Sequence, residues 1–442
     1  MLGGAELRKV SAVSRRRILG ISGALMASAG ASALVGCGGV AGSAAGRSDI
    51  SWLFWGSTSE VTANRKLIAS FQSAYPKYGV APNVIPGGGQ QLVEKLQILA
   101  GGGQGPDVFQ SAPLFMPWAS LNGFFAPLDP FIKASNVRIA DYVPATIRAA
   151  TFNGSVYALP YLVNYFGVFY NKAIFDKAHV AYPKPGWTWQ DFLSTAQAIA
   201  SNGSGKTGYW GVYPGDLSIN GMLPWIWMNG GTVFDNDAHP TRSTMSDPRT
   251  VAAIQWHADW ALKHKVAPVP ANISGEADPF LAGTVGMLIQ EIGGMAGLSQ
   301  QIKTFEWDFA PLPVGVKGSV NIAGSAYEGI YSHSHLKEEA WKFVSWYCGS
   351  GGLPLLTKLG HGVPPLKSLF KTFLNMPGYP KSKQLMLDQL HYLRPMPKST
   401  VFAAAQVTVY NNNLMDVFNG LGTASKACAQ IDTQINALLA KG

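Results

Sequence analysis

Apolar segments alternate with amphipathic helical segments after the first 48 residues, and this alternation restricts the possible folds more than any other feature. The segments at 49–55, 79–85 and 107–111 predict strands, and those at 58–75 and 90–100 predict helices. This β-α-β-α-β order favours a parallel sheet covered by helices, because parallel strands need a long crossover connection. We therefore expect an α/β fold.

The rest of the chain continues the pattern with a second set of elements. Residues 156–171 form a long extended segment, and 285–291 predicts a further strand. Helices are predicted at 188–201 and 247–265, and a last one near 423–440. The chain is long enough for two domains.

The first 36 residues predict an export signal. Arg15, Arg16 and Arg17 precede residues 18–36, which carry no charge, and this order of segments is typical of such signals. The stretch SRRRIL resembles a twin-arginine signal, and the general export route stays open. A membrane-spanning helix is the alternative, although many glycine, alanine and serine residues make the segment weakly apolar.

The cysteine at position 37 follows the stretch LVG, and LVGC resembles the lipobox of bacterial lipoproteins. The resemblance implies that Cys37 is lipidated and becomes the first residue of the mature protein. Residues 37–48 are rich in glycine, alanine and serine and are predicted to form a lipidated tether. We therefore expect an extracytoplasmic protein held at the cell membrane, with a buried cysteine as the alternative.

Charge and cysteine content exclude some classes of function. Without the five basic residues and one acidic residue of the first 36, the net charge falls from +9 to +5, and the remaining charges are scattered. A nucleic-acid partner is therefore not expected. Two cysteines remain, Cys348 and Cys428, and whether they form a disulfide stays open. Without a Cys/His cluster we expect neither a metal nor a cofactor.

Four stretches carry a resemblance to a known family. They are GPDVFQS (105–111), YALPYLVNYFGVFYNKAIFDKA (157–178) with the helix at 187–199, FLAGTVGMLIQEIGGMAGL (280–298) and AGSAYEGIYSHSHLKEEAWKFVSWYCG (323–349). In order and spacing they are similar to the extracellular solute-binding proteins of ABC importers, family 1, the maltose-binding-like group.

This resemblance implies a two-lobe fold of the type II, maltose-binding-like class, with a ligand cleft between the lobes and a hinge that lets them close. Lobe one would comprise 49–162 and 310–363, and lobe two would comprise 163–309 and 364–442. Family members are receptors and not enzymes, and their closed form is recognised by membrane permease subunits.

Ligands of doubly wound sheets bind beyond the carboxyl ends of the strands. That rule and the resemblance together select the candidate ligand-binding residues: Ser57, Gln110, Ser111, Tyr161, Asn164, Tyr165, Trp225, Trp227, Asn229, Glu291, Gly294, Tyr327, Arg394 and Phe402. Aromatic planes pack on the C–H faces of sugars, and amide, hydroxyl and charged groups bind their hydroxyls. At least one of Trp225, Trp227 and Phe402 is expected to line the cleft.

The sequence thus predicts a monomeric, lipid-anchored receptor that binds a carbohydrate and delivers it to an ABC permease. Among carbohydrates, an oligosaccharide is the preferred prediction. A receptor for a glycerol-phosphate compound or another polar solute is one alternative. A secreted carbohydrate-active enzyme is another, although the sequence contains neither a GxSxG nor an HExxH motif.

Replacing Cys37 tests the lipid anchor. Cys37→Ser removes the thiol that would carry the lipid, so the variant should move from the membrane fraction to the soluble fraction. Immunoblots of fractionated cells measure this. A variant that remains as membrane-bound as the parent would contradict lipidation and favour a membrane-spanning segment.

Overall fold

The computed structural model describes residues 48–201, 209–272, 278–360 and 362–441. These residues all lie within one compact unit, Ala45–Gly442. The predicted export signal and Cys37 lie outside the described residues, as does the predicted tether apart from Ser48. Among the residues that are described, no helix has the length and hydrophobicity needed to cross a membrane.

The first sheet contains the predicted β-α-β-α-β unit. In spatial order its strands are β2 (Tyr78–Ile85), β1 (Ser48–Trp55), β3 (Val108–Ser111), β12 (Gly324–Ile330) and β6 (Leu159–Asn164). Strand β1 is parallel to both β2 and β3, which confirms the predicted parallel sheet. Strand β12 returns from the distant part of the chain and is antiparallel to both of its neighbours.

A second sheet follows the long extended segment. Its strands, in spatial order, are β10 (Trp307–Ala310), β7 (Phe166–Asn171), β9 (Val285–Glu291) and β8 (Trp210–Tyr213). Strand β9 is antiparallel to β7 and parallel to β8. Two short ribbons complete the strands: β4 (Thr151–Phe152) with β5 (Ser155–Val156), and β11 (Asn321–Ile322) with β13 (Leu393–Arg394).

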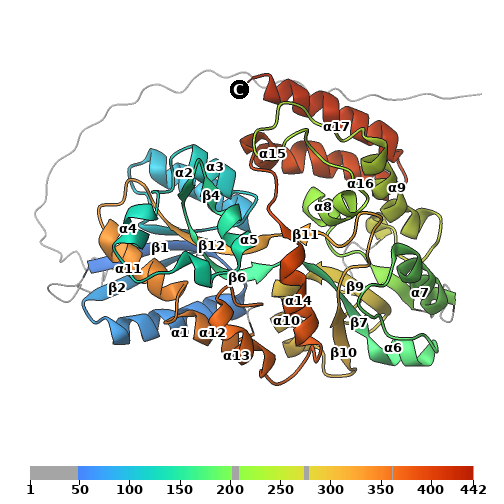
Figure 1. The fold of residues 1–442 in the computed structure, drawn as a ribbon, viewed down its shortest axis with the longest axis horizontal. Coiled ribbons are helices and arrows are strands. Elements are labelled where there is room, and N and C mark those ends of the chain that lie inside the picture. Colours follow the sequence, from blue (N-terminus) through green and yellow to red (C-terminus); the bar gives the residue numbers. More distant parts are fainter. Residues whose placement is uncertain (1–47, 202–208, 273–277, 361, 442) are drawn as a thin grey trace, which may run out of the picture. The chain divides into compact units, whose positions relative to one another are not determined.

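Helices cover the first sheet, and Figure 1 shows α2 and α3 on one side of it and α1 and α12 on the other. The helices in this part are α1 (Thr58–Ala74), α2 (Gly89–Gly101), α3 (Met116–Leu121), α4 (Asp129–Lys133), α5 (Pro144–Ala149), α11 (Lys337–Tyr347) and α12 (Leu353–Lys358). Helix α1 begins after Ser57, whose hydroxyl accepts a hydrogen bond from the Glu60 amide at 3.4 Å. Serine is favoured at this position because its hydroxyl can bond a free backbone amide of the first helical turn.

The remaining helices accompany the second sheet, and α9, α16 and α17 pack against one another. They are α6 (Lys172–Lys177), α7 (Trp189–Ser201), α8 (Ile219–Met228), α9 (Pro248–Leu262), α10 (Met295–Gln301), α13 (Phe370–Leu374), α14 (Lys383–Asp388), α15 (Thr400–Ala405), α16 (Asn412–Phe418) and α17 (Ala424–Leu439).

The two thiols lie in different parts of the core. Cys348 is buried among side chains around the first sheet, and Cys428 is buried with the aromatic side chains of α8 and α9. Both are free, so the structure contains no disulfide between them.

The chain passes from one sheet to the other within a single residue. Strand β6 ends at Asn164 and β7 begins at Phe166, so Tyr165 alone separates them. The buried Asn321 side chain holds this crossing: its Nδ2 donates to the Phe166 carbonyl at 2.7 Å and its Oδ1 accepts from the Phe166 amide at 3.1 Å. Asn321 begins β11, on the segment that returns from the second sheet to β12. One side chain therefore ties two crossing segments together.

Replacing Asn321 should destabilise the protein. Asn321→Ala leaves a buried amide and a buried carbonyl of Phe166 without this partner, which should lower the free energy of unfolding by about 2–4 kcal/mol. Urea denaturation followed by circular dichroism measures it. Asn83→Ala, at an exposed position of β2, is the control and should change stability little. Equal effects of the two substitutions would contradict a special role for Asn321.

Candidate ligand-binding cleft

A cavity of about 980 Å³ lies where the ends of the strands from both sheets meet. Trp55 ends β1, Asn164 ends β6, Tyr213 ends β8 and Glu291 ends β9, and all four line the cavity. The cavity thus lies at the carboxyl ends of strands, as the rule for α/β sheets predicts. Its size is typical of a site for a small molecule.

Five of the predicted ligand-binding residues line this cavity: Ser57, Tyr161, Asn164, Glu291 and Gly294. Gly294 belongs to the 3-10 helix η3 (Ile292–Gly294) that follows β9. A side chain at this position would collide with the Gln290 amide, whose Nε2 would lie 2.1 Å from the added Cβ. Glycine therefore allows the close approach of Gln290 in the cavity wall.

Asn164 connects the two sheets at the base of the cleft. Its Nδ2 donates a hydrogen bond to Glu291 Oε2, and its Oδ1 accepts one from the Gly293 amide at 2.8 Å. The side chain comes from β6 in the first sheet, whereas Glu291 ends the second sheet's β9 and Gly293 follows it. A ligand that contacts Asn164 would therefore contact the junction of both sheets.

Glu291 is a cleft carboxyl group whose ionisation is altered. Burial and, to a smaller extent, the nearby Asp216 carboxylate raise the pKa of Glu291 to about 7, and the hydrogen bond from Asn164 opposes this shift. Near neutral pH both forms are present, so this carboxyl group can donate or accept a hydrogen bond.

Two other predicted residues line the cavity with polar groups that are already bonded. The hydroxyl of Ser57 donates to Glu60 Oε2 at 2.8 Å as part of the cap of α1. The hydroxyl of Tyr161 accepts a hydrogen bond from Gln110 Nε2, and burial raises the Tyr161 pKa well above its usual value. Gln110 Oε1 also accepts a hydrogen bond from the Trp55 backbone amide at 2.9 Å. These residues shape the wall as well as face the cavity.

Gln110 and Ser111 are buried at the end of β3, behind the wall of the main cavity. Tyr165 and Tyr327 are buried too, and their hydroxyls donate to backbone carbonyls of Met386 and Thr146. The sequence expectation that these four side chains face the cleft therefore differs from the structure. Each stabilises the framework around the cavity.

The expectation that Trp225, Trp227 or Phe402 lines the cleft also needs correction. All three rings are at most 3% exposed and lie in the hydrophobic core beside the second sheet. Trp225 packs against Trp189, Trp256 and Trp260, and Phe402 packs against Phe234 and Tyr410. Nine of the ten residues of helix α8 are buried, both tryptophans among them, so these rings have no free face for a ligand.

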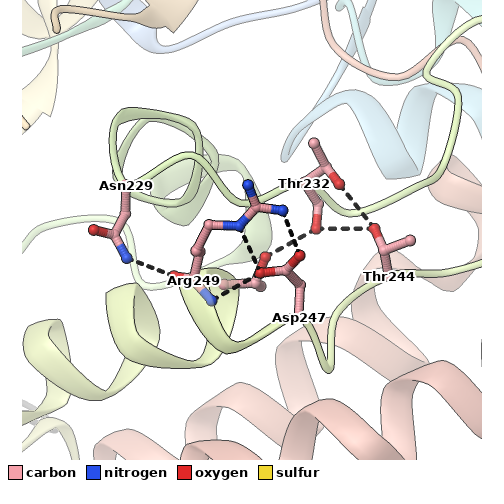
Figure 2. A network of polar contacts seen from close by, with 6 residues as sticks. Asn229, Thr232, Thr244, Asp247 and Arg249 are labelled. Atoms are coloured by element: carbon pink, nitrogen blue, oxygen red, sulfur yellow. Dashed lines mark hydrogen bonds and ion pairs between the residues drawn. The ribbon is translucent and has the colours of Figure 1, made fainter. Parts of the chain in front are cut away.

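Arg394 and Asn229 lie away from the main cavity as well. The Arg394 guanidinium lies 4.4 Å from the centre of the Trp227 ring and forms an ion pair with Asp237. Asn229 ends α8, and Figure 2 shows its side chain directed at Arg249. Its Nδ2 donates to the Arg249 carbonyl at 2.7 Å.

The network around Asn229 stabilises the start of α9. Asp247 caps this helix and forms an ion pair of 2.6 Å with Arg249, while the hydroxyls of Thr232 and Thr244 lie 2.9 Å apart beside them (Figure 2). Asn229 therefore joins the end of one helix to the beginning of the next, which corrects its predicted role in the cleft.

Comparisons with known proteins agree with this architecture. A family model for bacterial extracellular solute-binding proteins matches residues 56–352. The chain belongs to that family. The resemblance stated from the sequence is thereby confirmed, as is the two-lobe, maltose-binding-like fold class with its cleft and hinge.

Three relatives of this solute-binding protein are informative. The ABC substrate-binding protein Lmo0181 from Listeria monocytogenes, in complex with cycloalternan, has a TM-score of 0.80 at 24% sequence identity. The match covers 89% of this chain and 99% of the Lmo0181 chain. UgpB from Mycobacterium tuberculosis, in complex with glycerophosphocholine, has a TM-score of 0.77 at 22% identity, covering 90% and 99%. An uncharacterized lipoprotein from Streptomyces antibioticus is 25% identical over 65% of this chain and 63% of its own length.

Sequence reasoning missed several residues in the cleft of this solute-binding protein. Trp55 is absent from the predicted ligand-binding residues, although it ends β1 and the strand-end rule applies to it as it does to Ser57. Tyr213 and Asp216 were missed because the four-residue strand β8 was not predicted. A strand assignment for Trp210–Tyr213 would have placed both at a carboxyl end.

A second cavity of about 470 Å³ adjoins the main one. Tyr213, Gly215 and Asp216 line both cavities, and Asn411 and Met415 line the second. The loop after β8 therefore separates two hollows of this solute-binding protein and exposes an aromatic ring and a carboxylate to them.

The raised pKa of Glu291 should make stability depend on pH. Between the ordinary carboxyl pKa of 4.5 and the folded value of about 7, the folded state binds a proton that the unfolded chain has lost, so stability falls as the pH rises. Glu291→Gln should remove this fall and raise stability relative to the parent by about 1–3 kcal/mol across that range. Urea denaturation at several pH values measures it.

Glu306→Gln provides the matched control, because the Glu306 side chain is 66% exposed. Its difference from the parent should stay nearly constant with pH. A Glu291→Gln difference that is equally constant would contradict a raised pKa at Glu291.

Proposed function

We propose that this chain is the lipid-anchored receptor of an ABC importer, that it binds an oligosaccharide in the main cleft, and that it delivers it to membrane permease subunits as a monomer. The observation that carries the proposal is the combination of aromatic and polar groups in one cavity. The rings of Trp55, Phe115, Tyr161 and Tyr213 line it together with Asn164 and other amide and carboxyl groups.

This combination suits a carbohydrate. The C–H faces of a sugar ring pack on aromatic planes, and its hydroxyls need fixed hydrogen-bond donors and acceptors. The side chains of Asn164 and Gln290 supply both amide donors and amide acceptors in the cavity. The complex of a related receptor with cycloalternan supports the same class of ligand.

Membrane attachment rests on different support. Cys37 follows a charge-free apolar segment, and the related Streptomyces antibioticus protein is described as a lipoprotein. Two acyl chains or more are needed for a stable anchor, which lipidation at Cys37 would supply.

A thermal-shift panel of oligosaccharides identifies the ligand. A ligand that binds only the folded protein stabilises it by about 2.7 kcal/mol at a concentration one hundred times its dissociation constant. Chromatography of the ligand after incubation with the protein distinguishes a receptor from an enzyme: a receptor returns it unchanged, and cleavage products would contradict the proposal.

Replacing Trp55 tests the cleft itself. Trp55→Ala removes a stacking surface and should weaken binding of the panel's best oligosaccharide about tenfold or more, since ~1.4 kcal/mol corresponds to a factor of ten. Isothermal titration calorimetry measures the dissociation constant. Trp210→Ala, which removes a ring that is 39% exposed outside the main cleft, is the control. Unchanged affinity in Trp55→Ala would place the ligand elsewhere.

A further inference from the structure

The charged side chains that line the main cleft are all acidic. Glu60, Asp216, Asp278 and Glu291 line it, and its described lining contains no lysine, arginine or histidine. The whole chain carries a net charge of +9, so the sign of the charge in the cleft is opposite to that of the protein. A cleft lined by one sign of charge concentrates its field on whatever enters.

Among the described residues, these carboxyl groups form no ion pair. The ion pairs among the described residues join Arg138 with Asp141, Lys172 with Glu306, Arg249 with Asp247, and Arg394 with Asp237. None of them includes a carboxyl group of the cleft. The cleft therefore presents negative charge that a ligand can neutralise.

Local hydrogen bonds hold the acidic side chains in place. Asp216 accepts from the Ser218 amide at 2.8 Å, and Asp278 accepts from the Phe280 amide at 2.8 Å. Glu60 accepts from the Ser57 amide at 2.7 Å. Each of these carboxylates is thus oriented by a backbone donor before any ligand binds, which reduces the cost of ordering it.

Asp216 and Glu291 form the part of this lining in which two acidic groups act on each other. Asp216 follows β8, Glu291 ends β9, and the charge of Asp216 disfavours ionisation of Glu291. The Nδ2 atom of Asn164, from β6, donates a hydrogen bond to the Glu291 carboxyl group. A cation held near Asp216 and Glu291 would offset this repulsion and favour the ionised form of Glu291.

Aromatic rings line the same cavity. Trp55, Phe115, Tyr161 and Tyr213 present planes that attract cations and also pack on the apolar faces of sugars. Carboxylates and aromatic planes together recognise an ammonium group, whereas hydroxyl groups alone would leave the negative charge without compensation. A phosphate group would meet repulsion and no basic partner among the described lining residues.

We infer that the cleft selects a saccharide that carries a protonated amine, and that it excludes phosphorylated saccharides and glycerol phosphates. This inference rests on the proposed carbohydrate function. The amine lies at the Asp216 and Glu291 carboxyl groups, and the sugar rings lie on the aromatic side chains.

Three tetrasaccharides that differ only in the group at carbon 2 test this selectivity. Chitosan tetraose carries amines, chitin tetraose carries acetamides and cellotetraose carries hydroxyls, all on the same β-1,4-linked backbone. Titration calorimetry at pH 6 should show chitosan tetraose binding at least tenfold more tightly than the other two. Glycerol 3-phosphate should not bind.

Two variants locate the effect. Asp216→Asn and Glu291→Gln should each weaken binding of chitosan tetraose about tenfold and change binding of cellotetraose less than twofold. Glu306→Gln, far more exposed and outside the described lining, should change neither. In two buffers of different ionisation enthalpy at pH 6, chitosan tetraose should release protons from the parent and fewer from Glu291→Gln.

The outcomes separate this inference from the proposed function. Binding of cellotetraose, or of a neutral oligosaccharide from the thermal-shift panel, as tightly as chitosan tetraose overturns the preference for amines and leaves the receptor function standing. Binding of glycerol 3-phosphate overturns the exclusion of anions. Binding of none of the saccharides overturns both proposals.

Discussion

The crossing between β6 and β7 is the constraint on which the rest of the structure depends. Only Tyr165 separates the two strands, so the two sheets are joined without a loop, and the Asn321 side chain fixes the backbone on the far side of the crossing. Because of this short connection, Asn164 at the end of one sheet meets Glu291 at the end of another strand of the other sheet. The base of the cleft is therefore built where the sheets are least free to separate.

The chemistry of the cleft follows from what surrounds that junction. Four acidic side chains line the cavity, and burial together with the charge of Asp216 disfavours the charge of Glu291. The aromatic rings in the same lining can pack against a ligand, but they do not neutralise the carboxylates. Such a site gains from a ligand that supplies hydrogen-bond donors, and it gains most when one donor is positively charged.

The abundance of aromatic residues serves the core more than the cleft. The chain has 13 tryptophans, and four of them (Trp189, Trp225, Trp256 and Trp260) pack together beside the second sheet. Large rings bury much apolar area, and this burial stabilises a chain in which only 13% of the residues are charged. Trp55 differs because it ends a strand at the cavity and is only partly buried.

The sequence by itself determined the alternation of strands and helices, the cap of α1 at Ser57, and the approach of Asn164 and Glu291 to the cleft. Local propensity carries the first two, because it depends on neighbours in the chain, and the family resemblance together with the strand-end rule carries the third. The tertiary structure alone decided that Trp225 and Trp227 face the core and that Asp216 faces Glu291. Nine of the ten residues of helix α8 are buried, so the hydrophobic pattern of its sequence does not indicate which side faces the core. Strand β8 is only four residues long, and its pattern is too short to predict. The position of such side chains depends on how distant segments pack.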